Sequence, residues 1–341
     1  MRGKGGAKLS ELEEEKRRIL EKSSGERRPH WHGYVLDADP DDVQAALSWD
    51  EAAAGGLRLH LSVLGSGEER EERGEGGGGR PTVLFVHGTS VYGLFYADFL
   101  FALHRTGFRV VAVDLPGHGL SGGRRGDFTV EQLVGAVRAA TDRVLERFGS
   151  PVVVAGSSLG GITALYALAG DGRLAGAVLH NAALLGEGDH REIAQPSGLL
   201  RLLRPLVPVL AAVLPRARVS VWRYLDRDAL FDPTGRLAPH LDHFLVDPLL
   251  SDEYTLRAIA SQMRALPPRP VEEIEAPVLF VNGSDDSLFG VPLIERVRGR
   301  LERSGDRRLA VVSGGTHMIL HERTAEVAGL VAGWLDEHFP V

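Results

Sequence analysis

A serine flanked by glycines is the first feature of the sequence that could carry chemistry. Ser158 lies in the segment Gly156-Ser157-Ser158-Leu159-Gly160, which matches the Gly-x-Ser-x-Gly pattern of serine nucleophiles in acyl transfer. The pattern alone is weak because glycine is abundant, at 42 of 341 residues. A second match surrounds Ser121, so the context of each serine must decide between them.

The neighbouring elements favour Ser158. An apolar run at 151–155 predicts a buried strand before it, and residues 162–169 predict a helix after it. A sharp strand-to-helix turn raises a serine oxygen out of the sheet, and the N–H of Leu159 can donate to an oxyanion there. Ser121 instead lies in a glycine-rich loop several residues past the nearest predicted strand. We predict Ser158 as the nucleophile; the alternative is an ordinary helix-capping serine.

The base and the acid are predicted at the ends of two later strands. Asp285 and Asp286 follow the predicted strand 277–281, and His317 follows the predicted strand 308–312. The chain order serine, acid, histidine is the one that this kind of strand-to-helix nucleophile requires. Spacing does not choose between the two aspartates. His321 forms a His-x-x-x-His pair with His317, but with no carboxylate arrangement to complete a metal site we expect it on the surface of the last helix.

A second oxyanion donor is predicted after the strand 82–86. There the sequence reads His87-Gly88-Thr89, and the glycine permits a tight turn that aims the N–H of Thr89 into the site. The alternative is an ordinary loop glycine.

The elements that position these residues alternate along the chain from residue 80. Continuous apolar strands alternate with helical patterns, which predicts a mainly parallel, doubly wound α/β sheet under two layers of helices. Thr129 and Gln132 have the spacing of a capping box for a helix that ends before Gly149. The predicted strands are 57–64, 82–86, 109–113, 151–155, 176–179, 277–281 and 308–312.

Three segments depart from this rhythm. We predict a mobile charged arm at 1–30, a solvated glycine-rich connector at 65–79, and a helical cap inserted at 186–275, which is rich in proline and shows no clear strand. The catalytic domain then comprises 31–185 and 276–341. Within the cap, 199–214 is strongly apolar and predicts a lid or acyl-chain wall with transient contact to a membrane surface; the alternative is simple packing on the catalytic domain.

Composition excludes several functional classes. The chain has no cysteine, which excludes disulfides, a thiolate zinc site and a cysteine nucleophile. A net charge of −7 gives no support for nucleic-acid binding. No apolar run is long enough for a membrane span and residues 1–30 lack a signal peptide's apolar segment, so we expect a cytoplasmic protein. The oligomeric state is not indicated.

With these residues assigned, the chain resembles the α/β-hydrolase superfamily. The segment 117–126 is similar to the Gly-His-Gly-x-Ser-x-Gly-x-Arg-Gly loop of monoacylglycerol lipases and lysophospholipase-like enzymes, which makes Ser121 part of a structural loop. In the superfamily the acid usually ends a Gly-x-x-Asp group, which from Gly283 selects Asp286, and the residue after the His-Gly pair, here Thr89, supplies an oxyanion N–H. One departure is Ser157, because the lipase-like group commonly has histidine at that position.

The resemblance implies a serine hydrolase of the α/β-hydrolase fold with an inserted helical cap. We expect it to cleave carboxylic esters, such as a monoacylglycerol, a lysophospholipid or another apolar ester, through an acyl-enzyme and without metal or cofactor. An acyltransferase, or a hydrolase of another bond, could use the same triad. A non-catalytic binding protein that kept the fold is the alternative from another class.

Overall fold

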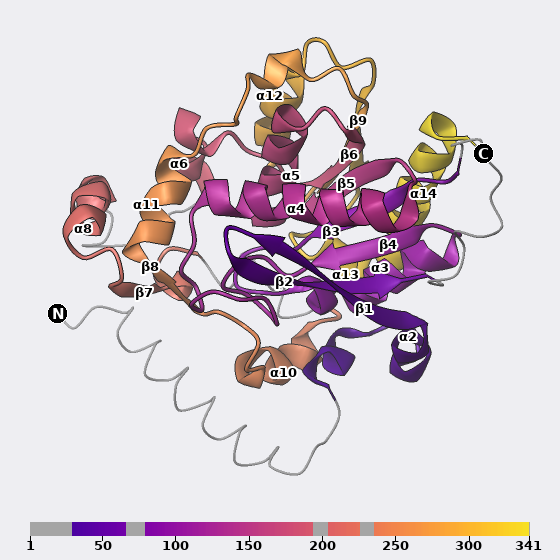
Figure 1. Cartoon of the computed structure of the whole chain (residues 1–341), viewed down its shortest axis with the longest axis horizontal. Helices are drawn as coiled ribbons and strands as arrows, with labels where there is room; N and C mark the ends of the chain where they lie inside the picture. The colour runs from indigo at the N-terminus through magenta and orange to yellow at the C-terminus, as the bar shows by residue number, and fades with distance from the viewer. Residues whose placement is uncertain (1–28, 66–78, 194–203, 226–234, 341) are drawn as a thin grey trace.

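The computed structural model describes residues 29–65, 79–193, 204–225 and 235–340 (Figure 1). Almost all of the predicted arm at 1–30 and of the connector at 65–79 lies outside these ranges, as does the first part of the apolar segment 199–214.

In the described residues, eight strands form one sheet in the order β1-β2-β4-β3-β5-β6-β9-β10. Strands β1 and β2 pair antiparallel, as do β2 and β4, and all remaining pairs are parallel. The predicted, mostly parallel sheet is therefore confirmed. The bounds are β1 (Leu47–Ala54), β2 (Leu57–Leu64), β3 (Thr82–Val86), β4 (Arg109–Val113), β5 (Val152–Ser157), β6 (Leu174–His180), β9 (Val278–Gly283) and β10 (Arg307–Val312).

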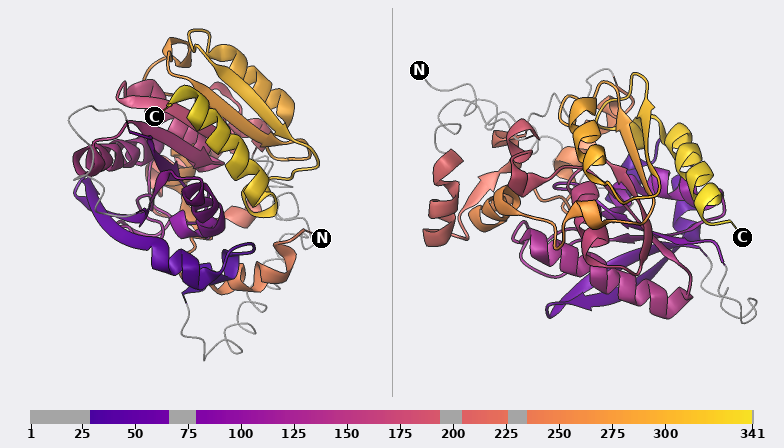
Figure 2. Two further views of the ribbon diagram at one scale, coloured as in Figure 1. Left: turned by 90° about the vertical axis from the view of Figure 1, so that its right-hand side faces the viewer. Right: turned by 90° about the horizontal axis from the view of Figure 1, so that it is seen from above.

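Helices cover both faces of this sheet (Figure 2). On one face pack α4 (Val130–Phe148), α5 (Leu159–Gly170) and α12 (Val291–Arg300). On the other pack α3 (Ala97–Arg105) and α14 (Thr324–His338), with α2 (Pro40–Ala46) and α13 (Ile319–Glu322) at its margin. Neighbouring residues of one strand enter opposite cores: Val152 and Val154 of β5 pack on the first face, and Val153 and Ala155 on the second. This double burial explains the continuous apolar runs in the sequence.

Helix α4 begins and ends where its sequence predicts. The Thr129 side chain accepts from the N–H of Gln132 while the Gln132 side chain accepts from the N–H of Thr129, so the predicted capping box is present. Gly149 closes the helix in the left-handed conformation, at φ 65°.

The described part of the segment between the neighbouring strands β6 and β9 does not add a strand to the eight-stranded sheet. It contains α6 (His190–Ile193), α8 (Val207–Val213), α10 (Leu241–Val246) and α11 (Leu256–Arg264). The sequence shows no clear strand in this segment, but two short ones are present, β7 (Arg218–Ser220) and β8 (Glu253–Thr255), which pair antiparallel. Three-residue strands are too short to give a readable pattern. The 186–275 boundaries of the cap stay a prediction.

Short 3₁₀ helices link the larger elements. They are η1 (His30–Tyr34), η2 (Gly93–Tyr96), η3 (Leu185–Glu187), η4 (Arg204–Leu206), η5 (Val221–Arg223), η6 (Ala238–His240) and η7 (Val271–Glu273). Within the described ranges, no helix has both the length and the apolar composition that crossing a membrane requires.

The parallel arrangement fixes the place of the predicted site. Strands β3, β5, β6, β9 and β10 run in the same direction, so the residues that follow them meet at one edge of the sheet. Ser158, Asp286 and His317 follow three of these strands.

Candidate active site

Ser158 forms a strained turn between β5 and α5. Its φ of 57° and ψ of −121° are a conformation that a residue with a side chain adopts only under constraint. The turn fits because two neighbours are glycine: a Cβ on Gly156 would overlap the carbonyl oxygen of Gly160, and a Cβ on Gly160 would overlap that of Val86. This turn therefore places the Ser158 side chain above the sheet edge, where Ser158 lines a cavity.

His317 and Asp286 form a buried pair. His317 Nδ1 lies 2.9 Å from Asp286 Oδ2, and the two residues are 5% and 3% exposed. Asp286 Oδ2 also accepts from Asn181 Nδ2 at 2.9 Å, while Oδ1 accepts from the backbone N–H groups of Leu288 and Phe289. Every direction of this carboxylate is therefore taken by an N–H donor, which fixes its orientation toward His317.

The electrostatics of the pair keep the carboxyl ionised. Burial alone would raise the pKa of Asp286, but electrostatic attraction to His317, the His317 hydrogen bond and the Phe289 N–H outweigh it and lower the pKa to about 2. An ionised Asp286 accepts the Nδ1 proton of His317 and leaves Nε2 as the free acceptor. Asp285 is exposed and accepts from the Ser284 hydroxyl, so of the two aspartates only Asp286 is brought to His317.

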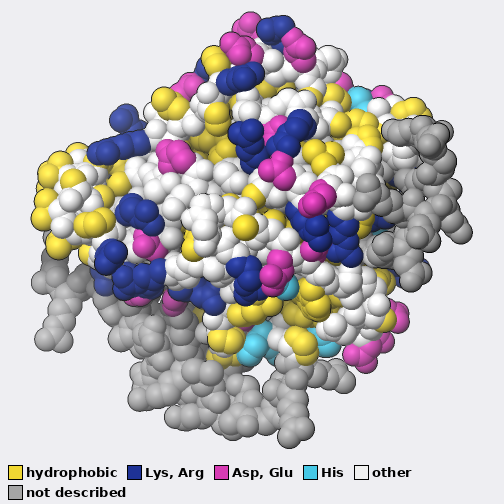
Figure 3. All heavy atoms as spheres, in the orientation of Figure 1, with side chains coloured by type: hydrophobic (Ala, Val, Ile, Leu, Met, Phe, Trp, Pro, Cys, Tyr) yellow, Lys and Arg dark blue, Asp and Glu magenta, His cyan; other side chains and the backbone are white. Residues whose placement is uncertain are grey.

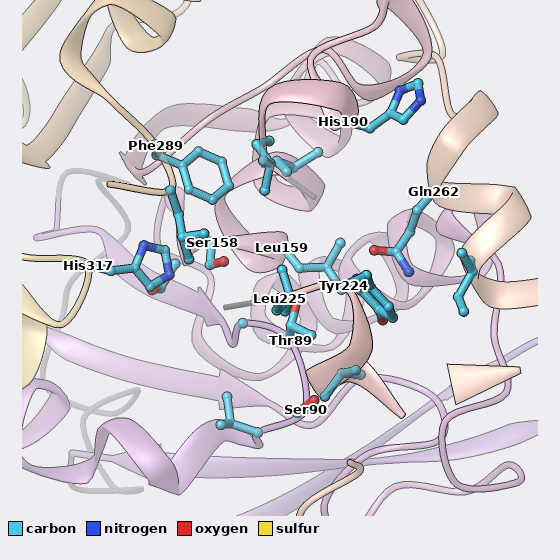
Figure 4. Close-up of a pocket in the computed structure, with 18 of the residues that line it drawn as sticks. Thr89, Ser90, Ser158, Leu159, His190, Tyr224, Leu225, Gln262, Phe289 and His317 are labelled. Atoms are coloured by element: carbon cyan, nitrogen blue, oxygen red, sulfur yellow. The ribbon is translucent and has the colours of Figure 1, made fainter. Parts of the chain in front are cut away.

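Ser158 and His317 lie side by side at one end of the cavity (Figure 4). Among the described residues no hydrogen bond joins Ser158 Oγ to His317. Such bonds commonly tighten only when a substrate is bound.

The two predicted oxyanion donors lie around Ser158. Leu159 is the first residue of α5, so its N–H has no acceptor within the helix and lies at the positive end of the helix dipole. Thr89 belongs to the loop that follows β3, and this loop packs closely on the nucleophile turn: a Cβ on Gly88 would meet Ser158 Cβ at 3.3 Å. Both residues line the cavity (Figure 4).

A hydrogen-bonded group next to Ser158 was missed by the sequence analysis. Tyr96 donates its hydroxyl proton to Ser157 Oγ at 3.2 Å, and Ser157 Oγ lies 2.8 Å from His180 Nδ1. The His180 ring centre is 5.8 Å from that of His317. His180 is the last residue of β6 and Asn181 follows it, so their position after the predicted strand 176–179 was the available signal.

Two other sequence predictions are decided by burial. His321 is buried against Phe95, whose carbonyl oxygen is 2.9 Å from Nε2, so its expected surface position is wrong. It lies in the short helix α13, whose residues Ile319, Leu320 and His321 are buried, and not in the last helix, α14. Ser121 donates to the Asp114 carbonyl oxygen at 2.5 Å and accepts from the His60 N–H at 2.8 Å, which agrees with a structural role.

The cavity has a volume of about 380 Å³ and a predominantly apolar lining. Side chains of the cap form much of its wall, among them Val207 and Leu210 of α8 and Ile259 of α11. Polar groups, including His190 and Gln262, lie at the end away from His317 (Figure 4). Within the described part of the chain no Asp or Glu lines this cavity, and no cluster of three or more His, Asp or Glu side chains is arranged to hold a metal ion.

The sequence matches a known family over most of its length. The family model described as serine aminopeptidase, S33, matches residues 78–324. Two curated relatives align over shorter regions: the acetyltransferase component of the acetoin cleaving system of Cupriavidus necator (30% identical over 181 residues, 51% of this chain and 43% of the relative) and a putative non-heme haloperoxidase of Mycobacterium phage D29 (32% over 142 residues, 41% and 45%). The chain thus spans less than half the length of the curated relatives it matches.

Solved structures share the whole fold. The monoacylglycerol lipase of Paleococcus ferrophilus superposes with a TM-score of 0.63 at 24% identity, covering 82% of this chain and 99% of that one. A soluble variant of the Saccharomyces cerevisiae monoglyceride lipase, solved with a substrate analogue, gives 0.68 at 17% identity, covering 87% and 97%. These superpositions confirm the predicted α/β-hydrolase fold.

Proposed function

Because the chain belongs to the serine aminopeptidase S33 family of α/β-hydrolases, we propose that it is a serine hydrolase with Ser158 as nucleophile, His317 as general base and Asp286 as the acid that orients it. The observation that carries the proposal is the 2.9 Å hydrogen bond between His317 Nδ1 and Asp286 Oδ2 beside the strained Ser158 turn. The family match supports hydrolysis but leaves the scissile bond open.

The mechanism is two-step acyl transfer. His317 Nε2 takes the Ser158 proton as Oγ attacks the ester carbonyl, and the N–H groups of Thr89 and Leu159 stabilise the oxyanion. His317 then gives that proton to the leaving alcohol, which leaves an acyl-enzyme. A water molecule, deprotonated by His317, then attacks the acyl-enzyme, and His317 returns that proton to Ser158 Oγ as the acid leaves.

An apolar ester is the substrate class that the cavity favours. The substrate of an aminopeptidase carries a free N-terminal ammonium group, and a buried ammonium group needs a carboxylate partner. The described lining contains no Asp or Glu but does contain Arg204 and Arg223. Two structural neighbours are named as lipases of monoacylglycerol or monoglyceride, which supports an apolar acyl chain in the cavity. The predicted cap, residues 186–275, would then supply the acyl-chain wall.

Helix α8 supports contact with a lipid surface. Its outer side chains are strongly exposed, with Val209 at 62% and Val213 at 74%, while Val207 and Leu210 of the same helix line the cavity. In Figure 3 this helix forms an apolar group at one end of the molecule. An exposed apolar face of this kind is stabilised at a membrane interface, and its place beside the cavity would let the substrate pass from the lipid to Ser158.

Labelling with a fluorophosphonate tests the nucleophile. Wild type should be labelled, Ser158→Ala should not, and Ser121→Ala, which removes the serine of the second Gly-x-Ser-x-Gly segment, should be labelled like wild type. Labelling that survives in Ser158→Ala contradicts the assignment.

A substrate series tests the bond and the chain length. We expect p-nitrophenyl esters of medium and long acyl chains to give a higher kcat/KM than the acetate, and aminoacyl p-nitroanilides to be cleaved at least 100-fold more slowly. Preference for the acetate would overturn the apolar-acyl proposal, and efficient anilide cleavage would overturn the ester proposal.

Sedimentation with anionic phospholipid vesicles tests the surface contact. Val209→Asp with Val213→Asp should reduce vesicle binding at least 5-fold, whereas Leu330→Asp, an equally simple change at an exposed leucine of α14, should not. Equal binding by all three proteins would refute the role of α8.

A further inference from the structure

The loop that carries Thr89 is held from outside the sheet by the segment around β8. Ser90, the next residue, has a left-handed φ of 69°. Its N–H donates to the Tyr254 hydroxyl at 2.7 Å, and its carbonyl oxygen accepts from the Ser251 N–H at 2.8 Å. Both polar groups of one constrained residue are therefore fixed by partners about 160 residues further along the chain.

The bond to Tyr254 has a defined direction. His118 Nδ1 lies 3.1 Å from the carbonyl oxygen of Pro116, which can only accept, so Nδ1 carries a proton. Burial holds the pKa of His118 well below its usual range, so the ring is neutral and Nε2 is an acceptor. The Tyr254 hydroxyl, 2.9 Å from Nε2, therefore donates to His118 and keeps its oxygen for the Ser90 N–H.

We propose that Tyr254 is a positioning residue for the oxyanion site, through which the cap segment at β8 holds the Thr89 N–H in its working orientation. The inference rests on the proposed serine-hydrolase function. Tyr254 is fully buried and is not among the residues that line the described cavity, so it acts through Ser90 and not on the substrate.

The physical reason is the narrow geometry of an oxyanion donor. Such an N–H must lie about 2.7–3.1 Å from the developing oxyanion, and removing one donor costs about 100 to 1000-fold in kcat. The Ser90 N–H and the Thr89 carbonyl form one peptide unit, and the Thr89 N–H belongs to the unit before it. The two units are joined at the Thr89 Cα, so a displacement of the first unit moves that Cα and with it the Thr89 N–H. Without Tyr254, the left-handed Ser90 loses its N–H partner and can relax toward a more favourable backbone conformation.

The hydroxyl can be removed while the ring keeps its contacts. The Tyr254 ring packs edge-on against Phe128 at 4.8 Å and against His118 at 5.6 Å, and the neighbouring Thr255 N–H donates to the Gly126 carbonyl oxygen. We therefore expect Tyr254→Phe to fold.

Tyr166 offers a matched control. It is also buried, and its hydroxyl accepts from the Leu185 N–H at 3.0 Å and lies 3.1 Å from the Ala265 carbonyl oxygen, to which it donates. Tyr166→Phe thus removes a tyrosine hydroxyl with two similar bonds, but at a site away from the oxyanion loop.

The test measures kcat and KM on an activated ester and on its thionoester, in which sulfur replaces the carbonyl oxygen. Sulfur is a weak acceptor, so the rate ratio of ester to thionoester reports on the oxyanion site. For Tyr254→Phe we expect kcat to fall about 10 to 100-fold, a part of the loss for a whole donor, with KM within twofold and a smaller ester-to-thionoester ratio. Tyr166→Phe should change none of the three.

A Tyr254→Phe enzyme with kcat within twofold of wild type, or with an unchanged ester-to-thionoester ratio, overturns the inference. If that variant does not fold, His118→Phe replaces it. This change keeps an aromatic ring but removes both the Nε2 acceptor of the Tyr254 hydroxyl and the Nδ1 bond to Pro116. A lower kcat at constant KM supports the proposal and an unchanged kcat overturns it. Ser158→Ala is assayed in parallel. Activity in Ser158→Ala refutes the proposed function, whereas an inactive Ser158→Ala beside a fully active Tyr254→Phe refutes only the role of Tyr254.

Discussion

Replacing Asp286 with asparagine turns one of the two accepting oxygens of this buried side chain into an N–H donor. Asp286 accepts from four N–H donors: Asn181 and His317 on Oδ2, Leu288 and Phe289 on Oδ1. An asparagine has only one accepting oxygen, so its amide nitrogen must face one of these pairs. Backbone N–H groups cannot exchange roles, whereas His317 can move its proton from Nδ1 to Nε2. We therefore expect the asparagine oxygen to face the backbone pair and its amide nitrogen to face His317.

The consequence is the wrong tautomer of the base. With its proton on Nε2, His317 cannot accept the proton of Ser158. The same exchange lowers kcat by about 10⁴-fold in the serine proteases where this triad was first defined, which corresponds to about 5 kcal/mol of transition-state stabilisation. The Asn181 amide would also face another amide nitrogen, and an unpaired buried donor costs about 1–3 kcal/mol of folding stability.

The assay compares Asp286→Asn with Asp285→Asn. Both remove one negative charge from neighbouring positions, but Asp285 is exposed and its carboxylate accepts a hydrogen bond from the Ser284 hydroxyl and not from His317. We expect kcat for ester hydrolysis at pH 8 to fall about 10⁴-fold in Asp286→Asn and less than twofold in Asp285→Asn, with urea unfolding to verify that both proteins fold. Retention of more than a tenth of the wild-type kcat by a folded Asp286→Asn, or a larger loss in Asp285→Asn, would refute the reasoning.

Three further predictions concern stability, the nucleophile turn and the cavity. Four fully buried histidines have lowered pKa values and bind protons only on unfolding, which favours the unfolded state as the pH falls toward 6.5 and below. Asp114, whose pKa burial raises to about 6, offsets part of this effect because it binds a proton in the folded state. The free energy of unfolding should therefore fall by about 4 kcal/mol between pH 7.5 and pH 5.5 in urea titrations, and a flat profile would contradict this. Gly160→Ala should abolish fluorophosphonate labelling or folding, because its Cβ would overlap the Val86 carbonyl oxygen; normal labelling would show that the turn is not tight. Ile259→Trp should raise KM for long-chain esters at least 10-fold while leaving the acetate unchanged, and an equal effect on both would show that acyl chains do not pass α11. The histidines are His87, His118, His180 and His321.

The sequence predicts well those parts of the fold in which local pattern and burial agree. Strands such as β3 and β4 are buried on both faces, so their apolar runs give the correct bounds. Strand β1 was missed because it lies at the sheet edge, and its residues Leu47–Ala54 are mostly polar or small and only half-buried or exposed. An edge strand of that kind owes its conformation to its neighbour β2 and not to its own pattern.

In the candidate site, too, some residues could be predicted from the sequence and others could not. Ser158, His317 and the aspartate pair could be predicted because each follows a readable strand. The contacts of Asn181 and His180 could not, because they depend on the order of strands in space: β6 lies between β5 and β9, which brings its last residues between the nucleophile turn and the acid. His321 was misplaced for a related reason, since its partner Phe95 is 226 residues away in the chain.

This strand order also places His180 close enough to His317 for their charges to interact. A second histidine beside His317 would oppose catalysis if it were charged, because an imidazolium forms on His317 when Ser158 is deprotonated. Burial first, and then repulsion from His317, lowers the pKa of His180 to about 3, so it is neutral wherever the enzyme would work. Ser157 accepts from Tyr96 and so has its own proton to donate to His180 Nδ1. The serine before Ser158 thus departs from the lipase-like pattern, and in this chain a histidine from the end of β6 is hydrogen-bonded to it.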